Sequence, residues 1–192
     1  MIPLFPMFIF SLVMSILPGP TNILSASYGK KNGLLNSIGF IVGAAVGFSI
    51  LAITVGLGLI KGIENFPLLL DFVKYIGSIY MLLISVCLFF FDEKTALAGG
   101  VKGRFLDGFF IQWVNPKSWV SAVIGVSRFS DSFDSLAIFV LVELVVGCLC
   151  IAIWAYVGEQ ISKVLSSPKQ QKILDGILGV SLATATLHIL AS

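Results

Sequence analysis

Charged residues are scarce in this sequence of 192 residues. Asp, Glu, Lys and Arg make up 11% of the chain, whereas a soluble domain usually carries about 25%. The 12 Lys and Arg residues are nearly balanced by 10 Asp and Glu residues, so no basic surface for nucleic acid is indicated. Hydrophobic residues make up 57%, and the mean hydropathy is +1.03. This composition indicates a protein of the lipid bilayer without a soluble domain.

The residue types that build most enzyme and metal sites are also few. The chain has a single His, and its Cys residues at 87, 148 and 150 form neither a Cys-x-x-Cys pair nor a metal-ligand set with His. No Ser/His/Asp order for nucleophilic catalysis is present. A Gly-x-x-x-x-Gly-Lys-Ser/Thr loop for ATP is also missing. We therefore expect no enzyme, no cofactor, no bound metal and no ATP-driven pump.

Apolar runs of about 20 residues, the length at which a helix crosses a bilayer, occur along the whole chain. The predicted spans are approximately residues 3–27, 37–60, 67–91, 105–126, 135–157 and 173–190. The last span is the weakest because it contains several polar residues, so five spans with one re-entrant segment are an alternative. We predict an all-α polytopic membrane protein with one transmembrane domain over residues 1–192.

The loop charges predict how these spans are oriented, because cytoplasmic loops carry an excess of Lys and Arg. One side of the predicted membrane has Lys30, Lys31, Lys94, Lys102, Arg104, Lys163, Lys169 and Lys172, and the other has Lys61, Lys74 and Arg128. With six spans, this asymmetry places both termini outside the cytoplasm, in a multi-pass protein of the cell (inner) membrane.

Two proline motifs interrupt predicted spans at matching positions. Leu-Pro-Gly-Pro-Thr-Asn ends at Asn22 in the first span, and Trp-Val-Asn-Pro-Lys ends at Lys117 in the fourth; Pro116 follows Pro20 by 96 residues, half of the chain length. A broken helix in a bilayer frees backbone groups that need a partner or a cavity. Broken helices at matching places in two halves point to a substrate site at a repeat interface.

The predicted spans also divide into two halves of three. Two repeats with an odd number of spans must be inverted relative to each other, as in many secondary transporters. We predict repeats of about residues 1–91 and 105–192 with broken first helices. Direct similarity between the halves is limited to the aligned Pro, a nearby Asn, and Gly77 and Gly179.

Several motifs in a fixed order carry a resemblance to a known family. They are Pro18-Gly19-Pro20-Thr21-Asn22, then Gly33, then Gly39, Gly43 and Gly47, then Lys74-x-x-Gly77-x-x-Tyr80, then Gly108 and Asn115-Pro116-Lys117. With these, the chain resembles the LysE/RhtB family of small amino-acid exporters along nearly its whole length. The resemblance implies secondary export of a small neutral or polar amino acid from the cytoplasm by proton exchange. A homo-oligomer is compatible with this resemblance.

Two details refine this resemblance. Pro-Gly-Pro-x-Asn-Ile-Leu together with Gln112-Trp113-Val114-Asn115-x-Lys117 looks like the cysteine and O-acetylserine exporter branch. Many members of the family carry Asp directly after Pro-Gly-Pro, where this chain has Thr21. A carboxylate role at that position therefore cannot be transferred to this chain.

We predict that the substrate binds between the two breaks. A half-helix that begins at Pro20 or Pro116 offers unpaired N–H groups and a positive dipole end to a carboxylate. Gly19 lets the backbone approach a ligand. The predicted binding residues are Pro18, Gly19, Pro20, Thr21, Asn22, Gln112, Asn115, Pro116 and Lys117. The alternative is that both motifs are structural kinks whose backbone groups bond to neighbouring helices.

Charged residues inside the predicted spans are candidates for coupling or gating. Lys117 lies near the middle of its span, where an ammonium group costs about 2.5–3.5 kcal/mol. It is therefore either a substrate-carboxylate or proton-linked group, or half of a structural ion pair. Lys74 and Glu143 are predicted at similar depth and either pair or leave Glu143 to carry the coupling proton, although Asp71 is an easier partner for Lys74. Asp175 is either a solvated residue at a helix start or part of a cytoplasmic gate.

Small residues predict where helices approach each other. Gly39, Gly43 and Gly47 share one helical face and, with Gly77, are expected to pack helices closely.

Two other functions are compatible with this architecture. A metal or other ion transporter would need several carboxylates or thiols at mid-span, where only Glu143 is available. A thiol–disulfide electron carrier would need Cys beside the proline motifs, where the chain has Ser15, Thr21, Asn115 and Ser118 instead.

Overall fold

The computed structural model describes residues 3–59, 75–79, 81–83, 85–86, 104–165 and 167–191. Its helices are α1 (Leu4–Ile16), α2 (Pro20–Asn32), α3 (Leu34–Leu59), α5 (Phe105–Val114), α6 (Pro116–Phe129), α7 (Phe133–Val164) and α8 (Pro168–Ala191). Residues 75–79, 81–83 and 85–86 are also helical, and no residue in these ranges is in a strand. The all-α prediction is confirmed for this part of the chain. Most of the predicted third span, with Lys74, lies outside the described residues.

Two of these helices are long and apolar enough to cross a bilayer alone. They are α3 over Leu34–Gly58 and α7 over Phe133–Val164. The consecutive helices α1 and α2 are bent by 60° and together form either one broken span or a re-entrant loop. The described ranges therefore contain two or three candidate spans, and α8 is not among them. Six spans and an inverted repeat remain predictions.

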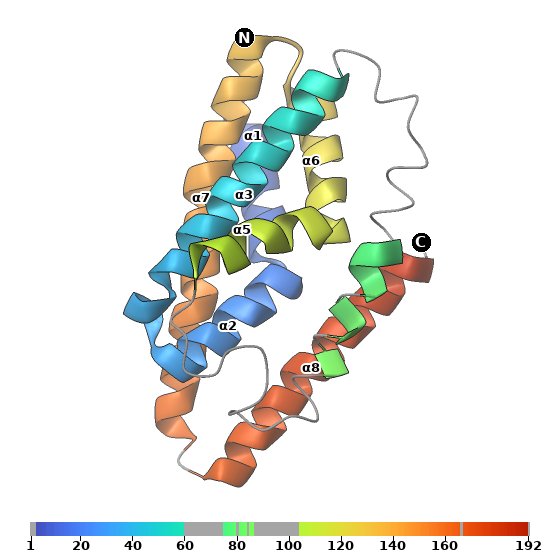
Figure 1. Ribbon diagram of the computed structural model, residues 1–192. Helices are drawn as coiled ribbons and strands as arrows, with labels where there is room; N and C mark the ends of the chain where they lie inside the picture. The colour runs from blue at the N-terminus through green and yellow to red at the C-terminus, as the bar shows by residue number, and fades with distance from the viewer. Residues whose placement is uncertain are drawn as a thin grey trace.

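The helices divide into upright and crossing ones. In Figure 1, α1, α3, α6 and α7 run roughly along the long direction of the molecule, whereas α2 and α5 cross it at mid-height or below. Helix α5 packs on α3, and α2 packs on α7. Helix α8 leans away from this group and contacts α2. The two proline breaks thus lie where an upright helix meets a crossing one.

Proline chemistry explains why the helices end where they do. A residue before proline is pushed out of the helical region, and Leu17, Gly19 and Asn115, which each precede a proline, have ψ of 137°, 177° and 109°. Pro20 and Pro116 then occupy the first position of α2 and α6, where the missing N–H costs nothing. Both predicted breaks are therefore present in the structure.

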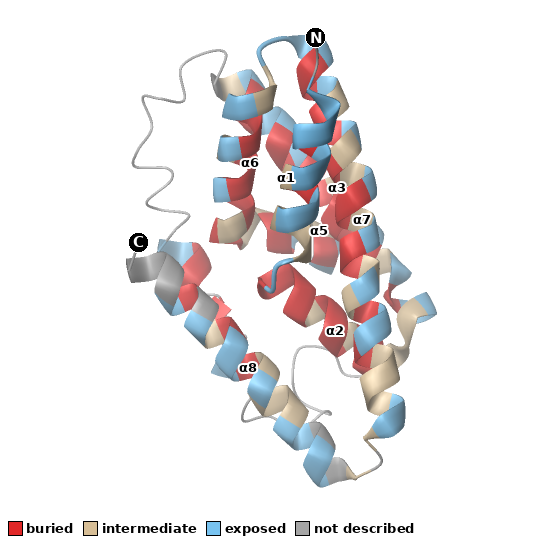
Figure 2. Cartoon of the chain, turned by 180° about the vertical axis from the view of Figure 1, so that it is seen from behind, coloured by how far each residue is buried: buried red, intermediate tan, exposed pale blue. Residues whose placement is uncertain are grey.

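The burial pattern differs from that of a soluble protein, although apolar clusters around Phe40 and Phe139 are also buried. Large apolar side chains such as Phe5, Phe110 and Leu149 are exposed on the outer faces of their helices, while Asn22, Gln112, Asn115 and Glu143 are buried. Figure 2 shows buried residues along α2 and α5 and on parts of α3, α6 and α7, with exposed residues on the outer faces. Such extensive apolar exposure is expected when lipid surrounds the protein.

Glycines let the crossing helix α5 touch α3 backbone to backbone. A Cβ atom on Gly43 would lie 1.9 Å from the carbonyl oxygen of Phe105, and one on Gly47 would lie 2.6 Å from that of Phe109. Gly77 lies against the second break, where a Cβ would be 2.1 Å from the carbonyl oxygen of Val114. Gly39 is half-buried.

A second close contact, not predicted from the sequence, joins α2 to α7. A Cβ on Gly29 would lie 1.9 Å from the Ala155 carbonyl oxygen, and one on Gly158 would lie 2.0 Å from the Ala26 carbonyl oxygen. Because both obstacles are backbone atoms, no side-chain rotation relieves them. Helix α2 is thereby fixed against α7 below the first break.

Gly158→Ala is therefore expected to lower the free energy of unfolding in detergent by about 1–3 kcal/mol, the usual cost of overpacking. Gly147→Ala in the same helix is the matched control, since its Cβ would meet nothing nearer than Ser15 Oγ at 3.8 Å. Alanine there is expected to be neutral or to stabilise the helix by up to about 1 kcal/mol. Equal thermal unfolding of the two variants would contradict the close α2–α7 contact.

Candidate functional site

The two helix breaks lie against each other. The Lys117 ammonium group donates to the carbonyl oxygen of Leu17 at 2.8 Å, and a Cβ on Gly19 would lie 2.9 Å from Lys117 Cδ. Asn115 Nδ2 donates to Thr21 Oγ1 at 3.3 Å. The structure thus brings residues from opposite halves of the chain into one cluster.

Side chains satisfy the carbonyl groups that the first break frees. Asn22 Nδ2 donates to the carbonyl oxygens of Ser15 and Leu17 at 2.7 Å and 2.8 Å. Trp154 Nε1, from α7, donates to the carbonyl oxygen of Ile16 at 3.1 Å. At this end of α1, side chains bond to the freed backbone groups, as the structural-kink alternative expects, although Asn22 also lines the cavity described below.

The N-termini that follow the two breaks differ from each other. At the second break, Asn115 Oδ1 accepts from the Lys117 backbone N–H at 3.1 Å, so α6 is capped. Trp119 Nε1 also donates to the freed carbonyl oxygen of Trp113 at 2.8 Å. At the first break, Gly19 occupies the N-cap position of α2 and supplies no side-chain cap. Of the two N-termini, only that of α2 therefore lacks a capping side chain.

A buried polar network connects the breaks to α3. Gln112 Oε1 accepts from Ser118 Oγ and, at 3.5 Å, from Thr21 Oγ1. Gln112 Nε2 donates to the Ala44 carbonyl oxygen at 3.2 Å. Thr21 links this network to Asn115. These bonds hold α2, α5 and α6 in one arrangement around the breaks.

A cavity of about 60 Å³ lies at this junction. Among the predicted binding residues, it is lined by Gly19, Thr21, Asn22, Gln112, Asn115 and Lys117. The other three predicted residues do not line it: Pro20 and Pro116 are buried at helix starts, and Pro18 is exposed. Ala44, Ala45 and Phe48 of α3 form an apolar wall.

Glu143 is the second charged residue that lines this cavity. Its side chain, on α7, is only 4% exposed, and Oε1 has no hydrogen-bond partner among the residues the structure describes. Lys117 bonds to Leu17 rather than to Glu143. The cavity therefore contains one positive and one negative group that do not neutralise each other directly. The predicted partner Lys74 is outside the described residues.

Asp175 lies away from the cavity, in an ion pair that joins α8 to α2. Its Oδ2 is 2.6 Å from Lys30 Nζ. The prediction that Lys30 is a loop residue is wrong, because α2 continues to Asn32 and Lys30 is 7% exposed. The helix ends only at Gly33, whose φ of 77° favours glycine.

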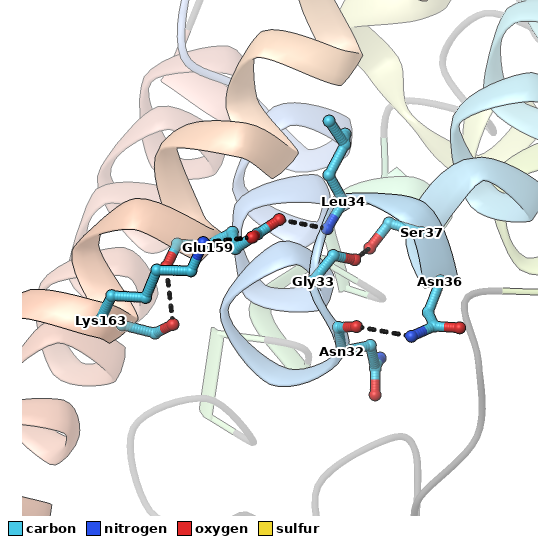
Figure 3. Close-up of polar contacts among 8 residues, drawn as sticks. Asn32, Gly33, Leu34, Asn36, Ser37, Glu159 and Lys163 are labelled. Atoms are coloured by element: carbon cyan, nitrogen blue, oxygen red, sulfur yellow. Dashed lines mark hydrogen bonds and ion pairs between the residues drawn. The ribbon is translucent and has the colours of Figure 1, made fainter.

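Glu159 has a structural role that sequence reasoning missed. Figure 3 shows its carboxylate reaching the start of α3, where Oε2 accepts from the Leu34 backbone N–H at 2.7 Å. Its Oε1 accepts from Lys163 Nζ at 2.6 Å. A carboxylate at a helix N-terminus is favourable, but the partner is 125 positions away, so no local pattern indicates it.

Comparisons with known proteins identify the family of this chain. Residues 12–192 match the model of the LysE type translocator family. The chain is 24% identical over 192 aligned positions to an uncharacterized membrane protein, YrhP, of Bacillus subtilis (strain 168), covering 88% of this chain and 90% of that protein. No solved structure matches. Since the family match covers nearly the whole length, the chain belongs to the LysE type translocators, a family of membrane transporters.

Proposed function

We propose that the protein is a secondary exporter of a small zwitterionic amino acid, driven by proton exchange across the cell membrane. The observation that carries this proposal is the cavity between the two breaks, with Lys117 and Glu143 as the charged residues that line it. A zwitterion presents the two complementary charges. Family membership supports export of an amino acid or a related compound.

The part of the proposed site that receives the substrate carboxylate is the uncapped N-terminus of α2 beside Lys117. The Lys117 side chain crosses directly in front of Gly19, so ammonium group and helix N-terminus can act on one carboxylate. The Thr21, Gln112 and Asn115 side chains provide the neutral donors and acceptors nearby.

The size of the cavity limits the substrate. With about 10–15 Å³ needed for each water-sized sphere, a cavity of about 60 Å³ holds about four to six non-hydrogen atoms. Glycine and alanine, with five and six non-hydrogen atoms, match this capacity, and serine and cysteine, with seven, exceed it by one atom. Within the proposed cysteine and O-acetylserine branch, the structure thus favours the smaller substrate.

The remaining assignments complete the proposed exporter. Asp175, at the contact between α2 and α8, is proposed as a gating residue. Lys74 is proposed as a coupling residue because its predicted depth in the membrane is similar to that of Glu143. The proposed orientation, with both termini outside the cytoplasm, follows from the distribution of Lys and Arg. For the ion-transporter alternative, no group of three or more His, Cys, Asp or Glu side chains suited to a metal occurs within the described ranges.

The proposal is tested in proteoliposomes with an imposed pH gradient and radiolabelled glycine, alanine, serine, cysteine, O-acetylserine and lysine. We expect gradient-driven accumulation of the small neutral amino acids and none of lysine, which is too long for the cavity. Protein-free liposomes and collapse of the gradient by an ionophore are the controls. If no small amino acid accumulates in response to the gradient, the proposed function is wrong.

A further inference from the structure

The carboxylate of Glu143 is buried in the cavity without a compensating charge. It is 4% exposed, and its Oε1 forms no hydrogen bond with any described residue. The Ser11 hydroxyl group, on α1, faces it. An ionised carboxylate in a lipid-embedded interior is costly unless it is paired. Glu143 therefore needs a cationic partner or a proton in every state of the transporter.

We infer that Glu143 takes the substrate ammonium group and the coupling proton in turn, so that the two compete for one carboxylate. This inference rests on the proposed function and adds how substrate and proton are coupled. When the ammonium group enters, the proton leaves Glu143 for water; when the substrate leaves, a proton returns. The exchange is one proton for one zwitterion.

The other groups around Glu143 leave no competing site in the cavity. From α6, Lys117 supplies a positive charge held by the Leu17 carbonyl oxygen, and on α7 itself the Cys150 thiol is within electrostatic reach of both residues. From α3 only Ala44, Ala45 and Phe48 line the cavity, and from α1 and α2 only uncharged residues do so. Glu143 is thus the only carboxylate among the lining residues.

Competition also sets the charge of the cavity in each state of the transport cycle: no net charge with the substrate bound and one positive charge with the proton bound. With a zwitterion bound, Lys117 faces the carboxylate and Glu143 faces the ammonium group, so the cavity has no net charge. With the proton bound and the substrate gone, Glu143 is neutral and Lys117 remains on the negative end of α1, at Leu17. A cavity with both ligands absent leaves a bare buried carboxylate, which disfavours empty return.

The test compares L-alanine with propionate, which lacks only the amino group, as competitors of radiolabelled alanine exchange. In the wild type we expect propionate to compete at least tenfold more weakly than alanine. In Glu143→Gln this preference is expected to disappear. The ammonium group of alanine loses its anionic partner, whereas propionate has no ammonium group and loses no contact. Glu143→Asp, which keeps the charge, should retain part of the preference. Asp134→Asn, an exposed carboxylate at the start of α7, is the matched control and should behave as the wild type.

A second readout measures the competition itself. In the wild type, the apparent affinity for alanine should fall by up to tenfold for each unit by which the pH is lowered, because protons then occupy Glu143. In Glu143→Gln the affinity should not change with pH. If Glu143→Gln keeps the full preference for alanine, or keeps the wild-type pH dependence, the inference is overturned. Gradient-driven accumulation of alanine by the wild type still upholds the proposed function in that case. If Glu143→Gln fails to fold, a wild-type affinity that is independent of pH overturns it equally. Absence of wild-type alanine exchange contradicts the proposed function instead.

Discussion

Replacing Lys117 with methionine is expected to reduce transport by about 10- to 150-fold while the protein still inserts and folds. Hydrogen bonds to charged groups contribute about 1.5–3 kcal/mol, and each 1.4 kcal/mol corresponds to about a tenfold change in binding. Methionine keeps much of the aliphatic stem that packs in front of Gly19 but loses the ammonium group. Initial rates of alanine exchange, normalised to the protein recovered in proteoliposomes, measure the effect.

Two further variants separate charge from packing. Lys117→Arg keeps the positive charge, but its planar head group does not fit the single contact with Leu17, so we expect partial activity. Lys169→Met removes an exposed Lys from α8 and should leave transport unchanged. Wild-type rates in Lys117→Met would show that the ammonium group only satisfies a backbone carbonyl, as the structural-kink interpretation holds.

Both helix breaks could be predicted because their cause is local. Leu17, Gly19 and Asn115 each precede a proline, and this neighbour disfavours a helical conformation. Their proximity was also predicted, but only through the spacing of Pro20 and Pro116 and the logic of repeats. The bonds that join them, from Lys117 to Leu17 and from Asn115 to Thr21, depend on side-chain placement that no spacing gives.

The residues that sequence reasoning misplaced depend on distant partners. The sequence places Lys30 in the loop between the first two predicted spans, yet α2 continues past it and Asp175, 145 positions away, compensates the charge. Glu159 and Gly158 likewise acquire their roles from helices far along the chain. Helix α8 covers the weakest predicted span and is not among the candidate spans of the described ranges, so a sixth span remains a prediction.

The ion pair between Lys30 and Asp175 gives the second large expected effect. The pair joins α2 to α8 at 2.6 Å, and the Lys30 and Asp175 side chains are 1% and 16% exposed. Asp175→Ala would leave a buried ammonium group without this partner, and breaking a buried pair typically costs about 3–5 kcal/mol. We expect a loss of this order in the free energy of unfolding, measured by thermal and denaturant unfolding in detergent.

The chain offers its own matched control. Lys163 and Glu159 are also 2.6 Å apart, but the Lys163 side chain is 60% exposed, so Lys163→Met should cost no more than about 1 kcal/mol. The double variant Lys30→Met with Asp175→Leu should recover most of the loss, since an apolar pair can replace a buried ion pair. With the single variants Lys30→Met and Asp175→Leu measured alongside, the non-additivity gives the coupling between the two residues. If Asp175→Ala lowers the free energy of unfolding no more than Lys163→Met does, the ion pair contributes little to stability, and α8 is held to α2 by other interactions.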